Sequence, residues 1–192
     1  KYSLDGLTSI FRYDGIIKQA VKFLKYRRVT DLAREFVSLI PLDTSDLFCH
    51  SGLRAGIHSQ RPWIPGQARD DTKNEKNVAL IPIPLHVSRF RDRGFNQAEV
   101  LGRHLADRLQ VPFRIDILKR VIATTPQVEM KDRKDRLKNM KNVFSLYNSS
   151  FFTHHSLLLF DDVFTTGATM RAAGETLKRA GAKSVWAVTM AR

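Results

Sequence analysis

LLLFDDVFTTGATMR, residues 157–171, is the stretch of sequence that decides the fold. It opens with an apolar run, 157–160, which is typical of a central parallel strand covered on both faces. Asp161 and Asp162 follow directly, at the carboxyl edge where open α/β sheets bind their ligands. Small and hydroxyl-bearing residues at 165–169 form a turn, and a helical pattern begins at once. The stretch therefore predicts a strand, a ligand-binding turn and a helix in immediate succession.

The chemistry of this turn suits a sugar phosphate. Small side chains let backbone N–H groups face inward together, and a helix N-terminus adds partial positive charge, so residues 165–169 favour a phosphate monoester. Two carboxylates beside it, at an exposed edge, would accept hydrogen bonds from sugar hydroxyls, whereas a carboxylate facing bare phosphate would repel it. The alternative is an ordinary strand–turn–helix junction with a capping threonine. A cap explains one Thr or Asp, but not two adjacent acids followed by five small residues, so we expect a site for ribose 5-phosphate.

The remaining periodicities indicate an α/β domain. Helices are predicted over 13–26, 30–39, 96–109 and 169–180, and strands over 78–81, 114–118, 143–146, 157–160 and 185–190. Strands that alternate with helices give a mainly parallel sheet flanked by helices. The 192 residues are enough for one sizeable core, so we expect a single domain over 1–192. Residues 50–77 combine Gly, Pro and polar side chains without any period, which predicts a disordered insertion within that domain.

Charge and cysteine content narrow the function classes. The chain has 32 Lys and Arg against 19 Asp and Glu, a net charge of +13, which favours a polyanionic partner such as nucleic acid or a polyphosphate ligand. A generically basic, soluble surface is the alternative. Cys49 is the only cysteine, which excludes an internal disulfide and a zinc site built from several thiolates. No apolar run approaches the ~20 residues of a membrane span and no secretory leader is visible, so we expect a cytoplasmic protein.

The segment 157–171 resembles the 5-phosphoribosyl-1-pyrophosphate motif of type I phosphoribosyltransferases: an apolar run, an acid pair, two variable residues and a Thr-Thr-Gly-Ala-Thr loop. More narrowly, the chain resembles the ComF family, phosphoribosyltransferase-like proteins linked to competence for DNA uptake. The residues that carry this further resemblance are Leu24–Tyr26, Pro82–His86, Arg93–Ala98 and the spacing of Arg120, Thr124, Pro126, Gln127, Arg136 and Asn139.

The resemblance implies a role for each part of the site. Asp161 and Asp162 would hold the ribose 2- and 3-hydroxyls. Thr165, Thr166, Gly167, Ala168 and Thr169 would cradle the 5-phosphate. The pyrophosphate would lie near Leu85, His86, Ser88, Arg89 and Lys25, and a flexible loop with Arg120, Gln127, Arg133 and Arg136 would close over the reacting centre. A solvated basic rim is the alternative for the arginines, and a structural hydrogen bond is the alternative for His86.

The implied reaction is chemically coherent. Pyrophosphate leaves as the C1–O bond breaks, and the sugar becomes oxocarbenium-like. Arginines and Mg²⁺ would stabilise the departing charge, while a closed loop keeps water from the cation. The Mg²⁺ would be held by the ligand's own oxygens rather than by protein side chains.

Two departures from the family patterns bear on function. ComF proteins often begin with a four-cysteine zinc module, which this chain lacks, so the module was lost or lies upstream of Lys1. Thr165 stands where phosphoribosyltransferases of the hypoxanthine-guanine type have an aspartate that acts as base for a purine nitrogen. Salvage of a 6-oxopurine is therefore disfavoured, and the sequence does not identify the acceptor.

Two functions follow from these observations. The first is an Mg²⁺-dependent enzyme that transfers phosphoribosyl to a nitrogen nucleophile. The second is a non-catalytic factor in DNA uptake that binds phosphoribosyl pyrophosphate and single-stranded DNA, together with partner proteins of the uptake machinery. Grooves for single strands pair basic side chains with stacking aromatics. The candidates here are Tyr26, Phe90 and Phe95, beside Arg27, Arg28, Arg91 and Arg93.

Overall fold

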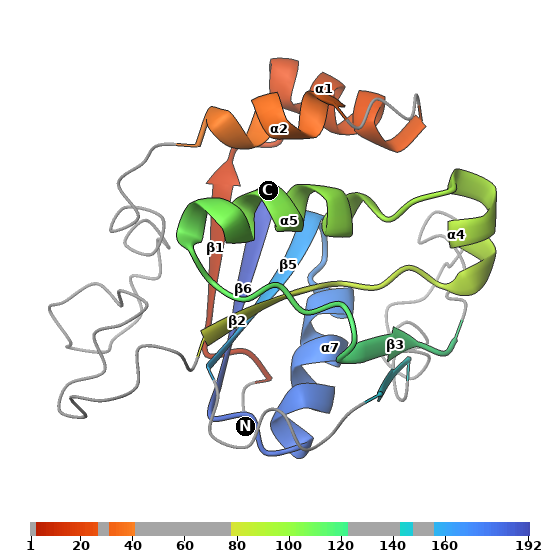
Figure 1. The fold of residues 1–192 in the computed structure, drawn as a ribbon, viewed down its shortest axis with the longest axis vertical. Coiled ribbons are helices and arrows are strands. Elements are labelled where there is room, and N and C mark those ends of the chain that lie inside the picture. The colour runs from red at the N-terminus through yellow and green to blue at the C-terminus, as the bar shows by residue number, and fades with distance from the viewer. Residues whose placement is uncertain (1–2, 27–30, 41–77, 123–142, 148–155) are drawn as a thin grey trace, which may run out of the picture.

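A computed structural model describes residues 3–26, 31–40, 78–122, 143–147 and 156–192, and the fold is built from these segments (Figure 1). Four strands form a parallel sheet in the order β1 (Gly6–Phe11), β6 (Ser184–Ala191), β5 (Ser156–Val163) and β2 (Val78–Pro82). A second, antiparallel pair consists of β3 (Leu118–Arg120) and β4 (Phe144–Leu146). The helices are α1 (Gly15–Tyr26), α2 (Asp31–Ser38), α4 (Val87–Arg93), α5 (Gln97–Leu109) and α7 (Ala168–Arg179). The mainly parallel sheet flanked by helices is confirmed.

The alternation of side chains along β5 creates the two layers of the core. Leu157 and Leu159 pack on the side of α7, whereas Leu158 and Phe160 pack on the side of α5, and none of the four is more than 1% exposed. Burying an apolar side chain of this size contributes about 1.5–3 kcal/mol. A strand that is apolar on both faces therefore has to lie inside the sheet, and β5 does, between β6 and β2.

Helices α1 and α2 lie beyond the carboxyl end of β1, where α2 packs on α5 and α1 packs on α2 (Figure 1). Phe36 of α2 stacks on Phe11 at the end of β1, with 5.6 Å between the ring centroids. Arg108 of α5 donates to the carbonyl oxygens of Val37 and Ile40, at 2.7 and 2.9 Å. The last carbonyls of a helix have no partner within the helix, so this guanidinium closes the end of α2 and fixes it to α5.

The sequence predicted most of these elements, with three differences. Residues 114–117 are not a strand: Phe113 makes a single parallel bridge to Leu80, and the strand begins only at Leu118. Neither β1 nor α4 was predicted. Helix α4 has no buried residue, so its sequence has no apolar period to detect. The predicted insertion over 50–77 lies outside the described residues, and the single domain stays a prediction.

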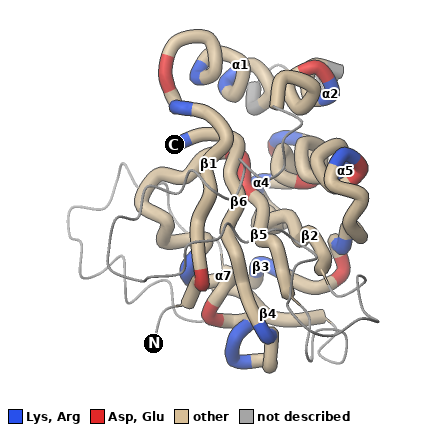
Figure 2. The backbone as a smooth tube through the Cα atoms, turned by 90° about the vertical axis from the view of Figure 1, so that its left-hand side faces the viewer, with Lys and Arg blue, Asp and Glu red and all other residues tan. Residues whose placement is uncertain are grey.

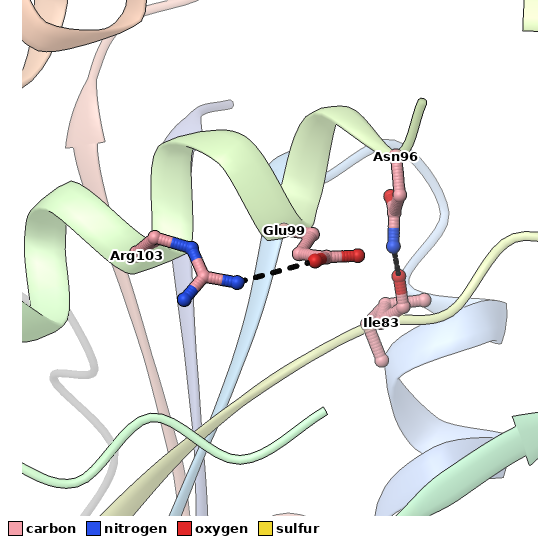
Figure 3. Close-up of polar contacts among 4 residues, drawn as sticks. All are labelled: Ile83, Asn96, Glu99 and Arg103. Atoms are coloured by element: carbon pink, nitrogen blue, oxygen red, sulfur yellow. Dashed lines mark hydrogen bonds and ion pairs between the residues drawn. The ribbon is translucent and has the colours of Figure 1, made fainter. Parts of the chain in front are cut away.

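The parallel arrangement brings the carboxyl ends of β2, β5 and β6 to one edge, and Asn96 joins that edge to α5 (Figure 3). The side chain of Asn96 is the N-cap of α5, where its Oδ1 accepts the N–H of Ala98 at 3.1 Å. Its Nδ2 donates to the carbonyl oxygen of Ile83, just after β2, at 3.0 Å. The loop after β2 is thereby held against the start of α5.

We predict that Asn96→Ala lowers the free energy of unfolding by about 2 kcal/mol, because it removes a helix cap and leaves a buried carbonyl without its donor. Asn96→Ser keeps a capping oxygen and loses only the donor, so it should cost about 1 kcal/mol. Urea denaturation measures both values. The control is Glu99→Gln, which breaks the exposed pair between Glu99 and Arg103 in Figure 3 and should change stability by less than about 1 kcal/mol. Wild-type stability for both Asn96 variants would contradict a stabilising role for the two hydrogen bonds of Asn96.

Candidate functional site

The acid pair lies within β5 rather than after it. Pairing of β5 with β6 continues to Val163, which lies opposite Ala191, so both acids are strand residues. Side chains alternate along a strand, so Asp161 lies on the α7 face and Asp162 on the α5 face. Asp161 is half-buried, and its Oδ1 accepts the N–H of Asp162 at 2.9 Å. Asp162 is only 8% exposed, which corrects the expectation of two acids at an exposed edge.

The turn after β5 presents backbone donors toward the same edge. The N–H of Phe164 donates to the carbonyl oxygen of Ala191, which extends the pairing of β5 with β6 by one bond. Gly167 follows as the N-cap residue of α7, and no side chain caps the helix there. The first helical bond runs from the N–H of Arg171 to the carbonyl of Gly167, at 2.9 Å. Among the described residues, no acceptor is recorded for the N–H groups of Gly167 and Thr169, and the first turn of α7 has no acid. Such a helix start favours an anion.

Gly167 is required at this turn for two reasons. Its φ of 70° lies in the left-handed region, which costs a side chain about 1–2 kcal/mol. A Cβ at this position would also overlap the ring of Phe164. Around this glycine, Thr165 and Thr166 are exposed, while Ala168 and Thr169 are partly buried at the start of α7. Of the five predicted residues, 165–167 therefore form the turn and 168–169 begin the helix that follows it.

The loop after β2 carries the residues predicted for the pyrophosphate. His86 is the N-cap of α4: its Nδ1 accepts the N–H of Ser88 at 3.3 Å and lies 2.8 Å from the Ser88 hydroxyl. Because Nδ1 accepts a backbone N–H, the neutral ring carries its proton on Nε2. His86 therefore makes a structural hydrogen bond, the cap at the start of α4. Leu85 and Arg89 are partly buried, Ser88 is exposed, and Lys25 lies in the last turn of α1, where its side chain is outside the described part.

Arg120 is a buried cation near the acid pair. It is 7% exposed on β3, and its guanidinium lies 5.7 Å from the ring centroid of Phe144. Burial lowers the pKa of Arg120, the positive charge of Arg89 lowers it further, and the negative charge of Asp161 opposes the shift. Residues from β3, α4 and β5 therefore share one electrostatic environment.

Arg120 is thus a strand residue, which differs from the flexible loop in which the sequence placed it. The other residues predicted for that loop, Gln127, Arg133 and Arg136, lie outside the described residues. The structure brings together the acid pair, the Gly167 turn, Arg89 and Arg120. Arg171 also contacts this turn, and the sequence analysis did not identify it. Its only signal in the sequence is that it is a basic residue in the first turn of a helix.

The donor set of this edge limits direct metal binding. Within the described segments, no three His, Cys, Asp or Glu side chains gather as metal ligands. A pair of carboxylates fits an ion such as Mg²⁺, which keeps several waters and takes much of its coordination from substrate phosphates. In the same segments, no helix is both long and apolar enough to cross a bilayer.

The amino-acid sequence is similar to those of known proteins. Residues 94–192 match the phosphoribosyl transferase domain family. The chain is similar to competence protein F of Haemophilus influenzae, with 37% identity over 115 residues, 59% of this chain and 50% of that protein. It is also similar to the DNA utilization protein YhgH of Salmonella typhimurium, with 34% identity over 62% of this chain and 51% of that protein. Competence protein ComFC of Bacillus subtilis is 26% identical over 96% of this chain and 63% of that protein.

The parallel sheet, the acid pair and the glycine turn thus define a domain of the phosphoribosyltransferase class. The chain belongs to the ComF family within that class. It spans about half the length of the first two relatives and 63% of the third.

We predict that Gly167→Ala lowers the free energy of unfolding by more than about 2 kcal/mol, because it adds left-handed strain and an overlap with Phe164. Gly181→Ala is the matched control: its φ is 96°, and a Cβ there meets nothing within 4 Å. That variant carries the strain alone and should lose about 1–2 kcal/mol. Denaturant titration compares the two, and equal losses would show that Phe164 does not restrict the turn.

Proposed function

We propose that the chain binds 5-phosphoribosyl-1-pyrophosphate at the carboxyl edge of its sheet. The 5-phosphate occupies the turn 165–169, and the ribose hydroxyls donate to Asp161 and Asp162. The pyrophosphate lies toward the loop after β2, near Arg89 and Arg120. One observation carries this proposal: carboxylates that suit hydroxyls, amides that suit a phosphate and two arginines that act on one another all lie at a single edge.

The charges of this edge suit the departure of pyrophosphate. Arg120 is desolvated, so its charge acts on a nearby anion through less intervening water than the charge of an exposed arginine. Arg89 adds a second positive charge from α4. Asp161 and Asp162 orient the sugar, and their negative charge stabilises the positive charge that develops at C1. Bound Mg²⁺, held chiefly by the ligand's oxygens beside this acid pair, would supply further neutralisation of the leaving group.

The proposed reaction is transfer of the phosphoribosyl group to a nitrogen nucleophile. Thr165, whose side chain is exposed, offers a hydroxyl in place of a carboxylate base, so the nucleophile has to arrive as a neutral amine or lose its proton to another group. This property argues against a 6-oxopurine and leaves other nitrogen nucleophiles as acceptors.

We predict that the double variant Asp161→Asn, Asp162→Asn binds phosphoribosyl pyrophosphate with Mg²⁺ at least about tenfold more weakly, because each lost carboxylate removes a charged hydrogen bond to the sugar. Isothermal titration calorimetry measures the affinity, and thermal melting tests whether the variant stays folded. Glu175→Gln makes the same chemical change on the exposed part of α7 and should bind as the wild type does. Wild-type affinity in the double variant would refute the proposed site.

Turnover is tested separately. If the chain is an enzyme, we expect pyrophosphate to appear from phosphoribosyl pyrophosphate only when a nucleobase or an amine is supplied. A coupled pyrophosphate assay across a panel of nucleophiles measures this release, with the double Asn variant as the inactive control. Tight binding without release for any acceptor would favour a binding protein over a transferase.

Helix α4 supports a second candidate function, the binding of single-stranded DNA. This short helix has no buried residue, and it carries Phe90, which is 46% exposed, next to the exposed Arg91. Arg89 and Arg93 lie on the same helix. An exposed aromatic ring among arginines is the arrangement on which single-stranded bases stack. Figure 2 shows Lys and Arg distributed over helices at both ends of the fold, so the net charge alone does not locate a nucleic-acid surface.

We predict that Phe90→Ala weakens binding to a poly-dT oligonucleotide by about tenfold, since one stacked base contributes roughly 1–3 kcal/mol. Arg91→Gln should reduce the slope of log affinity against log salt by about 0.7 for one lost phosphate contact. Fluorescence anisotropy measures both effects. Tyr147→Ala and Arg179→Gln, which change an exposed ring and an exposed arginine elsewhere, should leave binding unchanged. Equal losses in all four variants would mean that α4 has no special role.

A further inference from the structure

Arg171, in the first turn of α7, holds the peptide group between Thr166 and Gly167. Its Nη2 donates to the carbonyl oxygen of Thr166 at 2.6 Å. Its Nη1 lies beside Gly167, at 2.9 Å from the position that a Cβ on that glycine would occupy. The backbone of Arg171 also donates to the carbonyl of Gly167 at 2.9 Å. One residue therefore engages two consecutive carbonyl groups of the turn.

The geometry of the peptide bond gives this contact a consequence. The structure contains no cis peptide bond among its described residues, so the Thr166–Gly167 peptide is trans. In a trans peptide the C=O and the N–H point in opposite directions. When Arg171 draws the carbonyl of Thr166 toward itself, the N–H of Gly167 must point to the other side of the turn. This N–H has no recorded acceptor within the described residues.

Helix stability does not account for the position of Arg171. A cation in the first turn opposes the positive end of the helix dipole, and helices favour acids there instead. The first turn of α7 has no acid, and the basic residues of its last turn, Lys178 and Arg179, are the ones that suit the dipole. An exposed arginine at the unfavourable end adds positive charge where the turn has its inward N–H groups. An anion bound in the turn would offset both the charge of Arg171 and the positive end of the helix dipole.

We infer that Arg171 is a positioning residue for the 5-phosphate: it fixes the Thr166–Gly167 peptide so that the N–H of Gly167 faces the phosphate, and it adds a permanent positive charge from the opposite side of the same turn. The inference rests on the proposed function and assigns a residue outside the Thr-Thr-Gly-Ala-Thr loop to the phosphate subsite. It concerns the monoester end of the ligand alone, because Arg171 contacts the turn after β5 and not the loop after β2.

The test compares three probes that differ in which end of the ligand they contain. Ribose 5-phosphate carries only the monoester, inorganic pyrophosphate only the other end, and phosphoribosyl pyrophosphate both. Calorimetry with Mg²⁺ should show that Arg171→Gln weakens ribose 5-phosphate and phosphoribosyl pyrophosphate by about tenfold, the loss expected for a charge-assisted contact, and leaves pyrophosphate unchanged. Arg171→Lys keeps the charge and should recover part of the loss. Arg179→Gln, at the other end of α7, should bind all three probes as the wild type does.

The amide resonance of Gly167 reports the orientation of the peptide directly. Adding ribose 5-phosphate to the wild type should move this resonance downfield in a ¹H–¹⁵N spectrum, and the movement should be lost in Arg171→Gln. If Arg171→Gln keeps both the affinity and the movement, the inference is overturned while the proposed function stands. Equal weakening of all three probes would also overturn it, because that result indicates a general loss of charge or fold. A wild type that binds neither sugar phosphate would overturn the proposed function along with it.

Discussion

The hydrogen-bonded pairing of β5 with β6 continues beyond the last apolar residue of β5, and the site depends on that continuation. Phe160 is fully buried, and the next two residues are acids that remain in the same ladder, with Asp161 opposite Thr189. Because strand side chains alternate, this rigid backbone directs the two carboxylates to opposite faces of the sheet. Carboxylates on a loop could move to relieve their repulsion, whereas these are fixed by the same bonds that hold the core together.

The site combines one continuous segment with contributions from distant ones. The acid pair, the turn and Arg171 all lie within residues 161–171, so their relative positions follow from local backbone geometry. Arg120 and Arg89 reach the same edge from β3 and α4. Their positions depend on tertiary packing: Arg120 on the contact with Phe144, and the loop that precedes α4 on the bond between Asn96 and Ile83. In our interpretation, the segment recognises the sugar phosphate, and the assembled arginines determine what happens to the pyrophosphate.

The sequence predicted the parts of the fold that have a strong local pattern. Residues 157–160 had no polar interruption and α5 had a regular apolar stripe, so both could be placed. Helix α4 could not be found because it buries nothing, and β1 because its half-buried residues mix Gly, Thr and Ser with apolar ones. The motif located the acid pair and the turn, but the burial of Asp162 depends on pairing with neighbouring strands, which a single segment does not reveal. Arg120 was assigned to a loop because its neighbours are charged, whereas β3 and β4 bury it together.

The neighbouring positions of β1 and β6 have a consequence for how the chain acquires its structure. Gly6 lies opposite Trp186 in the sheet, so β1 pairs with a strand that is synthesised about 180 residues after it. Contacts this distant in sequence slow folding, because a long loop must close before any of them forms. During translation, residues 6–11 would leave the ribosome with both sides of the strand unpaired, and β6 covers one of them once residues 184–191 emerge. The nascent protein is therefore more exposed to aggregation until β6 has been synthesised.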